Sequence, residues 1–386
     1  MRVLWISDSP LLPSGLAKQT DHICRGLAER GVEVFVLGAY YHGPARGMHG
    51  YTLLPCPAST GFQSGFEELV VQLSRKLRLD LLVSFTLLRR VAYLGRVASR
   101  IGRKWLCYLP MDGPPTPGLA ERLDGEMQNG CLILLSNTAK QQIESSCSVK
   151  TGLPIPLGLP AGQYVPLPER QRLRADAGLQ DMIVLGRTDR NTHRKNYAAL
   201  FEAFGVLCES LDDVVLVIHA DPADPFGKDL RLLRRFYRLG QRVRFTCDDE
   251  RIQSVVGTGV LDEAGMRRLY NLFDIYVSPT QGEGFGMTLL ESIACGVPVV
   301  VTDWGSARET VGPGGLLVPP QRASPDPERG VLLAEMAPAA FAEVVHSLCH
   351  DPTHRRSLSA KGLDHANTFT TKRTVAAWLD VLVSQH

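Results

Sequence analysis

The fold is decided by the stretch DIYVSPTQGEGFGMTLLESIACGVPVVVTD, residues 274–303. It begins and ends with short apolar runs, DIYVSP and VPVVVTD, which enclose a glycine-rich turn and a run that reads as a helix. Continuous rather than alternating hydrophobicity is typical of parallel strands that are covered on both faces. A glycine-rich turn that leads into a helix offers backbone N–H groups to an anion. The stretch therefore predicts a strand, turn, helix and strand of an α/β fold, with an anion site at the turn.

The same pattern recurs along the 386 residues. Further strands are predicted at RVLWI, VEVFVLG, LLVSF, KWLCYLP and CLILLS in the first part, and at MIVLG, VVLVIHA and RVRFT in the second. The proline- and glycine-rich segment at residues 151–171 separates the two series. We therefore predict two doubly wound, Rossmann-like domains that face each other across a cleft, with boundaries at 1–160 and 161–367, and a last helix within 368–386. The segment PPQRASPDPERG reads as a surface loop.

Composition restricts the class of protein. The chain has 42 basic and 40 acidic residues, so its total charge of +2 indicates no partner. Its nine cysteines form no CxxC pair and lie mostly in apolar segments, which is typical of reduced thiols. No apolar run approaches the length of a membrane span, and the opening residues carry no cleavage site. We expect a cytoplasmic protein with no removed segment, either free or at the surface of a membrane.

Two carboxylates flank the glycine-rich turn. Thr288 and Glu291 have the spacing of a helix capping box, which would explain Glu291 by structure alone. Glu283 has no such explanation. Both acids fit a ligand site if each accepts hydrogen bonds from ligand hydroxyls, as on a sugar and a ribose, while cations neutralise phosphates between them. The expected donor contacts of this segment are Gly284, Phe285, Gly286, Met287, Thr288 and Leu289, together with Val260.

Cations suited to those phosphates follow the strand MIVLG. The loop carries Arg187, Arg190, Arg194 and Lys195, and guanidinium and ammonium groups bind phosphate oxygens well, although a solvated loop would show the same charges. In the first domain, Gly15 follows the opening strand and would let a helix start approach an anion, or would simply serve the turn. The loop has no GxGxxG pattern, which disfavours a dinucleotide-dependent dehydrogenase. The sequence has no Asp-x-Asp pair and no His/Cys cluster, so we predict no metal and no cofactor beyond the substrate.

These motifs resemble a known family. EGFGMTLLESIACGVPVVVTD, preceded by DEAGMRRLYNLFDIYVSPTQ, is similar to the signature of the retaining GT-B glycosyltransferases of family 4, the glycosyl transferases of group 1. The Gly15 loop, SNTAKQQIE, PIPLGLPAGQYVPL and VAAWLD follow in the family's order. The resemblance implies a GT-B fold whose terminal helix crosses back onto the first domain. It also implies a retaining, metal-independent transferase that moves a sugar from a nucleoside-diphosphate sugar to an acceptor hydroxyl.

The resemblance assigns roles residue by residue. Glu291 matches the acid that binds the donor ribose, and Glu283 matches the acid that faces the transferred sugar. Arg190 and Lys195 match the diphosphate-binding pair, which we expect to stabilise the leaving phosphate, and Gly15 matches the glycine turn of the first domain. Retention in the family is attributed to front-side attack in which the leaving phosphate helps to take the acceptor proton, so no protein nucleophile is implied.

Two positions depart from the family pattern. A histidine often lines the donor pocket in the first domain, but YLPMDGPP offers Met111 and Asp112 there. Asp112 either orients the acceptor hydroxyl as a catalytic residue or forms a turn between proline and glycine. The family usually has a glycine where Asp189 precedes Arg190.

Other functions fit parts of the same sequence. A nucleotide-sugar epimerase or hydrolase could share the fold, since a fold does not determine a reaction. A non-catalytic polymer-binding module is suggested by basic residues predicted to share one helical face: Arg231, Arg234, Arg235 and Arg238. Residues 75–104 hold nine basic residues against Asp80 alone. That bias suggests an anionic acceptor, either a phospholipid-linked glycan or a hydroxymethylated DNA base, or else helices with solvated basic faces.

Overall fold

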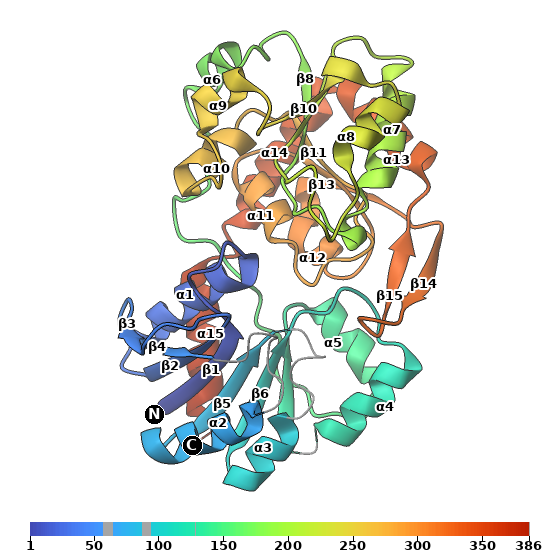
Figure 1. Ribbon diagram of the computed structural model, residues 1–386. Helices are drawn as coiled ribbons and strands as arrows, with labels where there is room; N and C mark the ends of the chain where they lie inside the picture. Colours follow the sequence, from blue (N-terminus) through green and yellow to red (C-terminus); the bar gives the residue numbers. More distant parts are fainter. Residues whose placement is uncertain (57–64, 87–93, 128, 386) are drawn as a thin grey trace. The chain divides into compact units, whose positions relative to one another are not determined.

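The computed structural model describes residues 1–386 except for 57–64, 87–93, 128 and 386. The chain divides into two compact α/β units, each built around its own sheet (Figure 1). The first unit comprises Met1–Pro160, Pro325–Leu332 and Phe369–His386, and the second comprises Ala161–Ser324 and Leu333–Thr368.

The first unit contains a seven-stranded sheet in the order β3-β4-β2-β1-β5-β6-β7. Its strands are β1 (Arg2–Asp8), β2 (Glu33–Ala39), β3 (Arg46–Gly47), β4 (Thr52–Pro55), β5 (Leu81–Phe85), β6 (Lys104–Leu109) and β7 (Gly130–Leu134). All neighbours pair in parallel except β3 and β4. Its helices are α1 (Gly15–Ala28), α2 (Phe66–Leu77), α3 (Leu94–Ile101), α4 (Pro117–Glu126), α5 (Asn137–Glu144) and α15 (Thr371–Val383). Within β1, the residues from Val3 to Ile6 are fully buried, as their continuous apolar run predicts.

The C-terminal helix α15 is part of the first unit's core and lies beside α1 (Figure 1). The indole of Trp378 is fully buried and packs edge-on against Trp5 and Tyr108, with ring centroids 5.0 Å apart in both cases. The N–H of Thr371 donates to Leu159 O at 3.0 Å. Aromatic pairs of this geometry add to the stability gained from burial, so the helix is held by the first unit's hydrophobic core.

The second unit contains a six-stranded parallel sheet in the order β10-β9-β8-β11-β12-β13. Its strands are β8 (Ile183–Arg187), β9 (Val214–Ile218), β10 (Val243–Phe245), β11 (Ile275–Ser278), β12 (Val299–Thr302) and β13 (Gly315–Val318), with β14 (Arg322–Asp326) and β15 (Val331–Glu335) paired separately. Its helices are α6 (Arg170–Asp176), α7 (Tyr197–Cys208), α8 (Leu230–Phe236), α9 (Glu250–Val256), α10 (Glu263–Tyr270), α11 (Met287–Ala294), α12 (Ala307–Val311), α13 (Pro338–His350) and α14 (Pro352–Ala366). Short 3₁₀ turns lie at His193–Lys195, Gly240–Arg242 and Gly312–Gly314.

The strand order of the second unit reverses between β8 and β11. The chain runs from β8 outward to β9 and β10, then returns to place β11 on the other side of β8. Ligands of open α/β sheets bind beyond the carboxyl ends of the strands at such a reversal. Gly186 permits the close packing there, because a Cβ at this position would lie 2.1 Å from the ring of Phe273. The loops after β8 and β11 are therefore the places to search for a site.

All ten strands predicted from apolar runs are present, and the fold class is confirmed. One local prediction is wrong. The segment PPQRASPDPERG is not only a surface loop, because it contains β14, and its later residues join the first unit. There the Thr116 N–H donates to Gly330 O at 2.8 Å. Within the described ranges, no helix has the length and apolar character that a membrane span requires.

Candidate functional site

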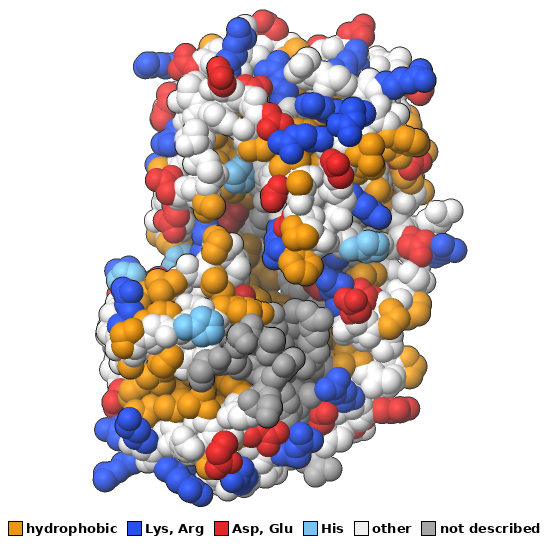
Figure 2. Space-filling model, viewed as in Figure 1, with side chains coloured by type: hydrophobic (Ala, Val, Ile, Leu, Met, Phe, Trp, Pro, Cys, Tyr) orange, Lys and Arg blue, Asp and Glu red, His pale blue; other side chains and the backbone are white. Residues whose placement is uncertain are grey.

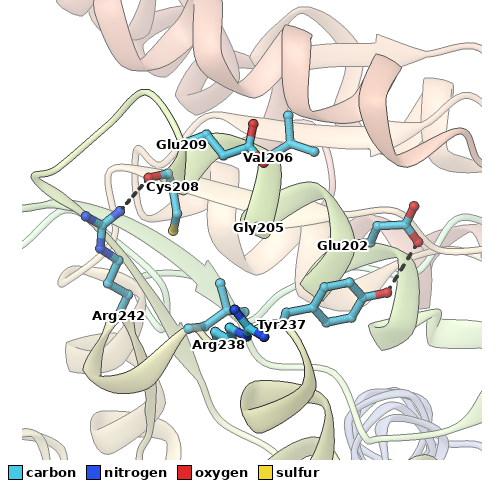
Figure 3. Close-up of a pocket in the computed structure, with 9 residues that line it drawn as sticks. Glu202, Gly205, Val206, Cys208, Glu209, Tyr237, Arg238 and Arg242 are labelled. Atoms are coloured by element: carbon cyan, nitrogen blue, oxygen red, sulfur yellow. Dashed lines mark hydrogen bonds between the residues drawn. The ribbon is translucent and has the colours of Figure 1, made fainter.

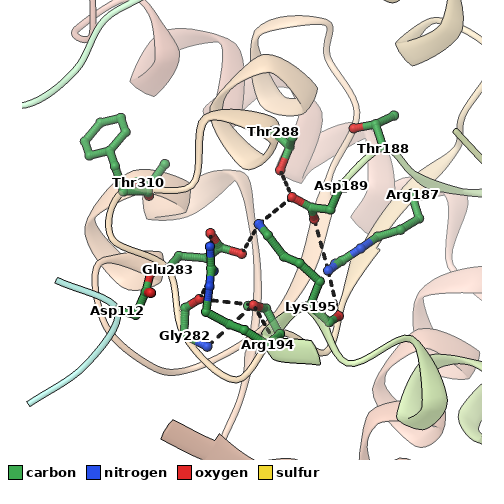
Figure 4. A network of polar contacts seen from close by, with 12 residues as sticks. Asp112, Arg187, Thr188, Asp189, Arg194, Lys195, Gly282, Glu283, Thr288 and Thr310 are labelled. Carbon is green, nitrogen blue, oxygen red and sulfur yellow. Dashed lines mark hydrogen bonds and ion pairs between the residues drawn. The ribbon is translucent and has the colours of Figure 1, made fainter. Parts of the chain in front are cut away.

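A cluster of buried charges lies at the strand reversal of the second unit (Figure 4). We define the charge cluster as Arg187, Asp189, Arg194, Lys195 and Glu283. The first four come from the end of β8 and the loop that follows it, and Glu283 comes from the glycine-rich turn after β11. Buried charges are costly unless they are paired, so this concentration in one place needs a reason.

Lys195 joins the two acids of the charge cluster. Its ammonium group donates to Glu283 Oε1 at 2.7 Å and to a carboxylate oxygen of Asp189. Arg194 contacts the other oxygen of Glu283 at 3.2 Å and donates to the carbonyl of Gly282. Glu283 itself is only 3% exposed. Each oxygen of the carboxylate thus already accepts from a cation.

Arg187 is the third cation of the charge cluster. Its guanidinium is fully buried, lies 3.0 Å from Asp189 Oδ2 and donates to the carbonyls of Val277 and Lys195 at 3.0 Å each. With both carboxylates ionised, three cations and two acids give the charge cluster a net charge of +1. A buried cluster with excess positive charge favours an anionic ligand.

The carboxylates of the charge cluster are ionised. Burial alone would raise the pKa of Glu283, but Lys195 and Arg194 more than offset it and hold the pKa below the ordinary 4.5. Burial opposes ionisation of Asp189 in the same way, and Arg187 and Lys195 hold its pKa well below its usual range. Both acids therefore act as hydrogen-bond acceptors and not as proton donors near neutral pH.

A pH-dependent stability follows from the lowered pKa of Glu283. A group whose pKa is lower in the folded state stabilises the fold above its unfolded pKa, and this contribution is lost as the pH falls through the folded value. We expect the thermal midpoints of the wild type and of Glu283→Gln to differ by a constant amount above about pH 4.5, and the difference to narrow below it. Circular-dichroism melts of both proteins from about pH 7 to about pH 3 measure this. A difference that does not change over the range contradicts the assignment.

The glycine-rich turn is held by hydrogen bonds to its backbone carbonyls. Ser306 donates from its N–H to Glu283 O at 3.1 Å and from its hydroxyl to Gly284 O at 2.9 Å, and Thr310 donates to Phe285 O. Gly286 has φ of 92°, a conformation that favours glycine, and is the N-cap of α11. The turn that carries Glu283 into the start of α11 is therefore rigid.

Thr288 and Glu291 do not form the capping box that their spacing would allow. The N-cap of α11 is Gly286, so Thr288 lies inside the first turn and cannot cap it. Its hydroxyl instead donates to Asp189 Oδ1 at 3.2 Å. Glu291 lies one turn further along the helix, where its carboxylate accepts from the hydroxyl of Tyr270 at 2.6 Å. With capping removed as an explanation, a ligand is the stronger reason for both acids.

The structure does not bring Arg190 to the charge cluster. Its guanidinium donates to Asp224 at 2.6 Å and lies 5.1 Å from the ring centroid of Phe226, and its side chain is 64% exposed. Arg194, and not Arg190, lies beside Lys195 at Glu283. The 3₁₀ turn His193–Lys195 places the side chains of Arg194 and Lys195 together against this carboxylate. The charge cluster therefore contains Arg194 with Lys195 and not Arg190, and the pairing of Arg190 with Lys195 on a diphosphate stays a prediction.

Three further predicted residues are not members of the charge cluster. Gly15 opens α1 after the N-cap Ser14, and a Cβ at Gly15 would meet no atom within 4 Å, so packing within the first unit does not require glycine. Asp112 belongs to the first unit and lies 3.7 Å from Arg329. Val260 is 79% exposed in the loop between α9 and α10.

A separate surface pocket of about 550 Å³ lies between α7 and the segment after α8 (Figure 3). Its lining mixes two acids with two arginines: Glu202, Gly205, Val206, Cys208, Glu209, Tyr237, Arg238, Leu239 and Arg242. Arg242 is tied to Cys208 O at 3.0 Å, and Tyr237 is close to Glu202. This balanced lining lacks the buried excess charge of the charge cluster, and it is the poorer candidate.

The basic helical face predicted for a polymer-binding module is not formed as expected. Arg231 pairs with Asp248 at 2.7 Å, and Arg234 lies 5.3 Å from the ring centroid of Phe245. Arg238 lies beyond the end of α8 with φ of 55°, so it does not continue the helical face. In the described part of the chain, no group of three or more His, Cys, Asp or Glu residues is arranged to hold a metal ion.

Sequence reasoning missed several residues of the site. Asp189 was considered only as a departure from a family glycine, yet it binds Lys195 and Arg187. Tyr276 is part of the apolar run DIYVSP and Tyr270 is part of a stretch that only resembles the family, so neither is predicted as a site residue, although Tyr270 bonds Glu291 and Tyr276 bonds Asp189. The available signal was position, because polar groups at the ends of neighbouring strands meet at one edge of a parallel sheet.

Comparison with known proteins agrees with this geometry. Residues 180–351 match the sequence profile of a family described as Glycosyl transferases group 1. A D-inositol 3-phosphate glycosyltransferase of Thermomonospora curvata is 35% identical over 112 residues, which are 29% of this chain and 23% of that protein. The chain thus aligns with less than a quarter of that curated relative.

Solved structures match over the whole chain. Sucrose-phosphate synthase from Thermosynechococcus elongatus superposes with a TM-score of 0.79 at 19% identity, covering 100% of this chain and 98% of that one. HepE of Anabaena in complex with UDP-glucose gives a TM-score of 0.74 at 17% identity, with both chains fully covered. At such identities the likeness shows the fold alone. The chain therefore has the GT-B fold, and its residues 180–351 match the glycosyl transferases of group 1.

Proposed function

We propose that this protein transfers a sugar from a nucleoside-diphosphate sugar to an acceptor hydroxyl. The observation that supports it most is the buried charge cluster, which presents Lys195 and Arg194 beside a rigid glycine-rich turn at the strand reversal. A diphosphate would neutralise the excess positive charge of the cluster. The HepE structure contains UDP-glucose, which makes a nucleotide sugar the natural class of donor to test.

Chemistry at this site would depend on charge. Breaking the bond between the anomeric carbon and the diphosphate develops negative charge on the leaving phosphate. Lys195, Arg194 and the amides at the start of α11 would stabilise that charge more strongly in the transition state than in the ground state. The existing ion pairs hold both cations in place, so little reorganisation is needed during the reaction.

The two acids, Glu283 and Glu291, would accept hydrogen bonds from different parts of the donor. Glu283 is fixed by two cations but has lone pairs left to accept hydroxyl protons from the sugar. Glu291 would accept from the ribose. Gly15 and Asp112, in the first unit, remain proposals for admitting the donor and for orienting the acceptor hydroxyl. Val260 is proposed as an outer contact of the donor.

We propose a retaining, metal-independent mechanism. Glu283 is a poor nucleophile, because both oxygens are already engaged by Lys195 and Arg194. Front-side attack assisted by the leaving phosphate needs no protein nucleophile. The anomeric configuration of the product, read by nuclear magnetic resonance against that of the donor, tests retention. Transfer in the presence of a chelator tests the metal requirement.

A panel of nucleoside-diphosphate sugars tests the proposed function. A donor at about 100 times its Kd stabilises the folded state by about 2.7 kcal/mol, which thermal melts resolve. Mass spectrometry then follows the protecting donor with and without acceptor alcohols. Release of nucleoside diphosphate supports a transferase, whereas interconversion of the intact donor sugar would indicate an epimerase. Failure of every donor to protect would contradict the proposal.

The acceptor is proposed to be anionic or held at an anionic surface. Arg75, Lys76 and Arg78 are exposed where α2 ends and β5 begins, and Arg103 is exposed just before β6. Arg96 and Arg100 are instead paired with Glu67 and Glu68 of α2. Of the predicted basic set, Arg89 and Arg90 lie outside the described residues. Lys and Arg side chains are visible at the end of the first unit in Figure 2.

The exposed set lies at the amino ends of β5 and β6, opposite the edge where ligands of α/β sheets bind. We therefore propose that it docks the protein on an anionic surface, such as a membrane that carries a lipid-linked acceptor, and does not contact the reacting hydroxyl. This keeps the cytoplasm, at a membrane surface, as the proposed location.

A charge variant tests this docking. Replacing Arg75, Lys76 and Arg78 by Gln is expected to weaken binding to vesicles of anionic phospholipid, by about 1 kcal/mol per residue at low salt. The matched control replaces Lys228, Arg235 and Arg238, which are also exposed, and should bind like the wild type. Binding to duplex DNA with hydroxymethylated bases is measured in a second experiment. If DNA binds, the slope of log affinity against log salt concentration should approach about −0.9 per phosphate contacted. Equal binding to neutral vesicles, with no dependence on salt, would refute an anionic surface.

A further inference from the structure

Four side chains surround the carboxylate of Asp189. Oδ1 accepts from the ammonium group of Lys195 and from the hydroxyl of Thr288, the latter at 3.2 Å. Oδ2 lies 3.0 Å from Arg187 and accepts from the hydroxyl of Tyr276 at 3.2 Å. A carboxylate oxygen accepts about two hydrogen bonds, so both oxygens are fully used inside the protein. Asp189 is therefore not placed to bind a ligand, and a role at the site must be exerted through its partners.

The partners of Asp189 belong to separate elements of the second unit. Arg187 ends β8, Tyr276 lies in β11, and Thr288 lies in the first turn of α11. Asp189 is 3% exposed, and Arg187 is fully buried. Buried polar groups whose hydrogen bonds are satisfied are rigid. The carboxylate, held from two strands and a helix, is therefore a fixed anchor for the group that it contacts.

Lys195 is the group that this anchor holds. Its backbone carbonyl accepts from Arg187 at 3.0 Å, and its ammonium group donates to Asp189. The ion pair of Arg187 with Asp189 thus binds both ends of the lysine, and we call these two residues the lysine clamp. A lysine side chain is a long, flexible stem that loses rotamer freedom when it is fixed. Because Lys195 lies in the loop between β8 and α7, the clamp supplies an orientation that a loop alone does not.

Part of the hydrogen-bonding capacity of Lys195 is left over. Within the described residues, its ammonium group donates to Asp189 and to Glu283 Oε1, the latter at 2.7 Å. An ammonium group has three donors, so one N–H is available to a ligand. The N–H bonds are held at tetrahedral angles, and holding two of them therefore directs the third.

We propose that Asp189 is a positioning residue that directs the third N–H of Lys195 to the terminal phosphate of a nucleoside diphosphate. This inference rests on the proposed function, since it needs a diphosphate at the charge cluster. By its charge alone, a carboxylate would repel the phosphate. Charge and position therefore predict opposite results when Asp189 is made neutral. The phosphate binds more tightly if Asp189 acts only by charge, and less tightly if it positions Lys195.

The test measures the affinity for the terminal phosphate. Calorimetry first identifies which of uridine, guanosine and adenosine diphosphate binds the wild type most tightly. That diphosphate and the corresponding monophosphate, which lacks the terminal phosphate, are then titrated into each variant. We call the ratio of the two affinities the phosphate preference. A hydrogen bond between charged groups is expected to give the wild type a phosphate preference on the order of tenfold or more.

Asp189→Asn keeps the size of the side chain and removes its charge. It is expected to lower the phosphate preference by about three- to tenfold, because Lys195 must then lose rotamer freedom when the ligand binds. The affinity for the monophosphate should not fall. In the background of Lys195→Ala, the same substitution should lower the phosphate preference no further, because the group that it positions is absent.

The matched control is Asp274→Asn. Asp274 is a carboxylate of the same unit that also binds two cations, Arg170 at 2.7 Å and Arg174 at 2.9 Å. It lies just before β11, at the opposite end of this strand from the glycine-rich turn. Its replacement breaks a comparable ion pair and should keep the wild-type phosphate preference.

A second variant serves if Asp189→Asn does not fold. That variant combines Asp189→Asn with Arg187→Met, which removes both charges of the lysine clamp. Replacing both members of a buried ion pair together is often tolerated, whereas removing one leaves an unpaired charge. The net charge of the charge cluster is unchanged, and the phosphate preference should fall at least as far as in Asp189→Asn.

The outcomes separate the positioning role from the proposed function. An unchanged or raised phosphate preference in Asp189→Asn, or in the double variant where only that one folds, overturns the role of Asp189. An equal loss with and without Lys195, or an equal loss in Asp274→Asn, overturns it too. A wild type that binds the diphosphate no more tightly than the monophosphate contradicts this inference and leaves the proposed function standing. If the wild type binds none of the three diphosphates, the proposed function fails and this inference fails with it.

Discussion

Replacing Lys195 by alanine is expected to lower the rate of sugar transfer by on the order of a hundredfold or more, because it removes a preorganised cation from the leaving phosphate. The substitution also leaves Asp189 and Glu283 without their shared partner. Breaking a buried ion pair costs about 3–5 kcal/mol, so stability should fall as well. Rates are therefore measured per folded molecule, at a temperature well below the thermal midpoint of the variant.

The matched control for Lys195→Ala is Arg190→Ala. Both residues lie on the loop after β8, but Arg190 contacts Asp224 and the ring of Phe226, and its side chain is 64% exposed. Arg190→Ala should transfer at close to the wild-type rate, whereas Arg194→Ala should resemble Lys195→Ala. If Arg190→Ala proves as damaging as Lys195→Ala, the proposal of Arg194 in place of Arg190 is wrong.

Glu283→Gln is expected to lower transfer by on the order of a hundredfold, while affinity for nucleoside diphosphate stays within roughly threefold of the wild type. Glutamine keeps the size of the side chain but loses the charge that Lys195 and Arg194 neutralise. Glu291→Gln should instead weaken binding of the nucleotide itself, because its carboxylate is proposed to read the ribose. Calorimetric titration with nucleoside diphosphate measures the affinity of both variants. Equal loss of affinity in the two variants would contradict the separate roles of Glu283 and Glu291.

The sequence predicts most of the fold, because parallel strands that are buried on both faces consist of continuous apolar runs. The strands that it misses lie at edges or carry unsuitable residues. The edge strand β13 has only four residues, GLLV, between glycines and prolines, so it reads as part of a loop. The strand β14 contains Pro325, which reads as a loop residue until its pairing with β15 is known.

The candidate site is predicted in part. Glu283 and Lys195 lie together as expected, because each follows a strand at the reversal of the sheet. The choice between Arg190 and Arg194 could not be made from spacing. It depends on the 3₁₀ turn His193–Lys195 and on the left-handed Asn196, with φ of 54°, which directs Arg194 inward. The hydrogen bond between Thr188 and Tyr270 joins residues 82 positions apart, which no local pattern encodes.

The central claim is that the charge cluster binds and activates a nucleoside-diphosphate sugar. Slow hydrolysis of the donor tests it most directly, because water takes the place of the acceptor and no acceptor has to be identified. Mass spectrometry follows the release of nucleoside diphosphate from each donor of the panel by the wild type and by Lys195→Ala. The account predicts release by the wild type from at least one donor, and release by Lys195→Ala no faster than in buffer. Hydrolysis at equal rates by the two proteins, or by neither, would contradict it.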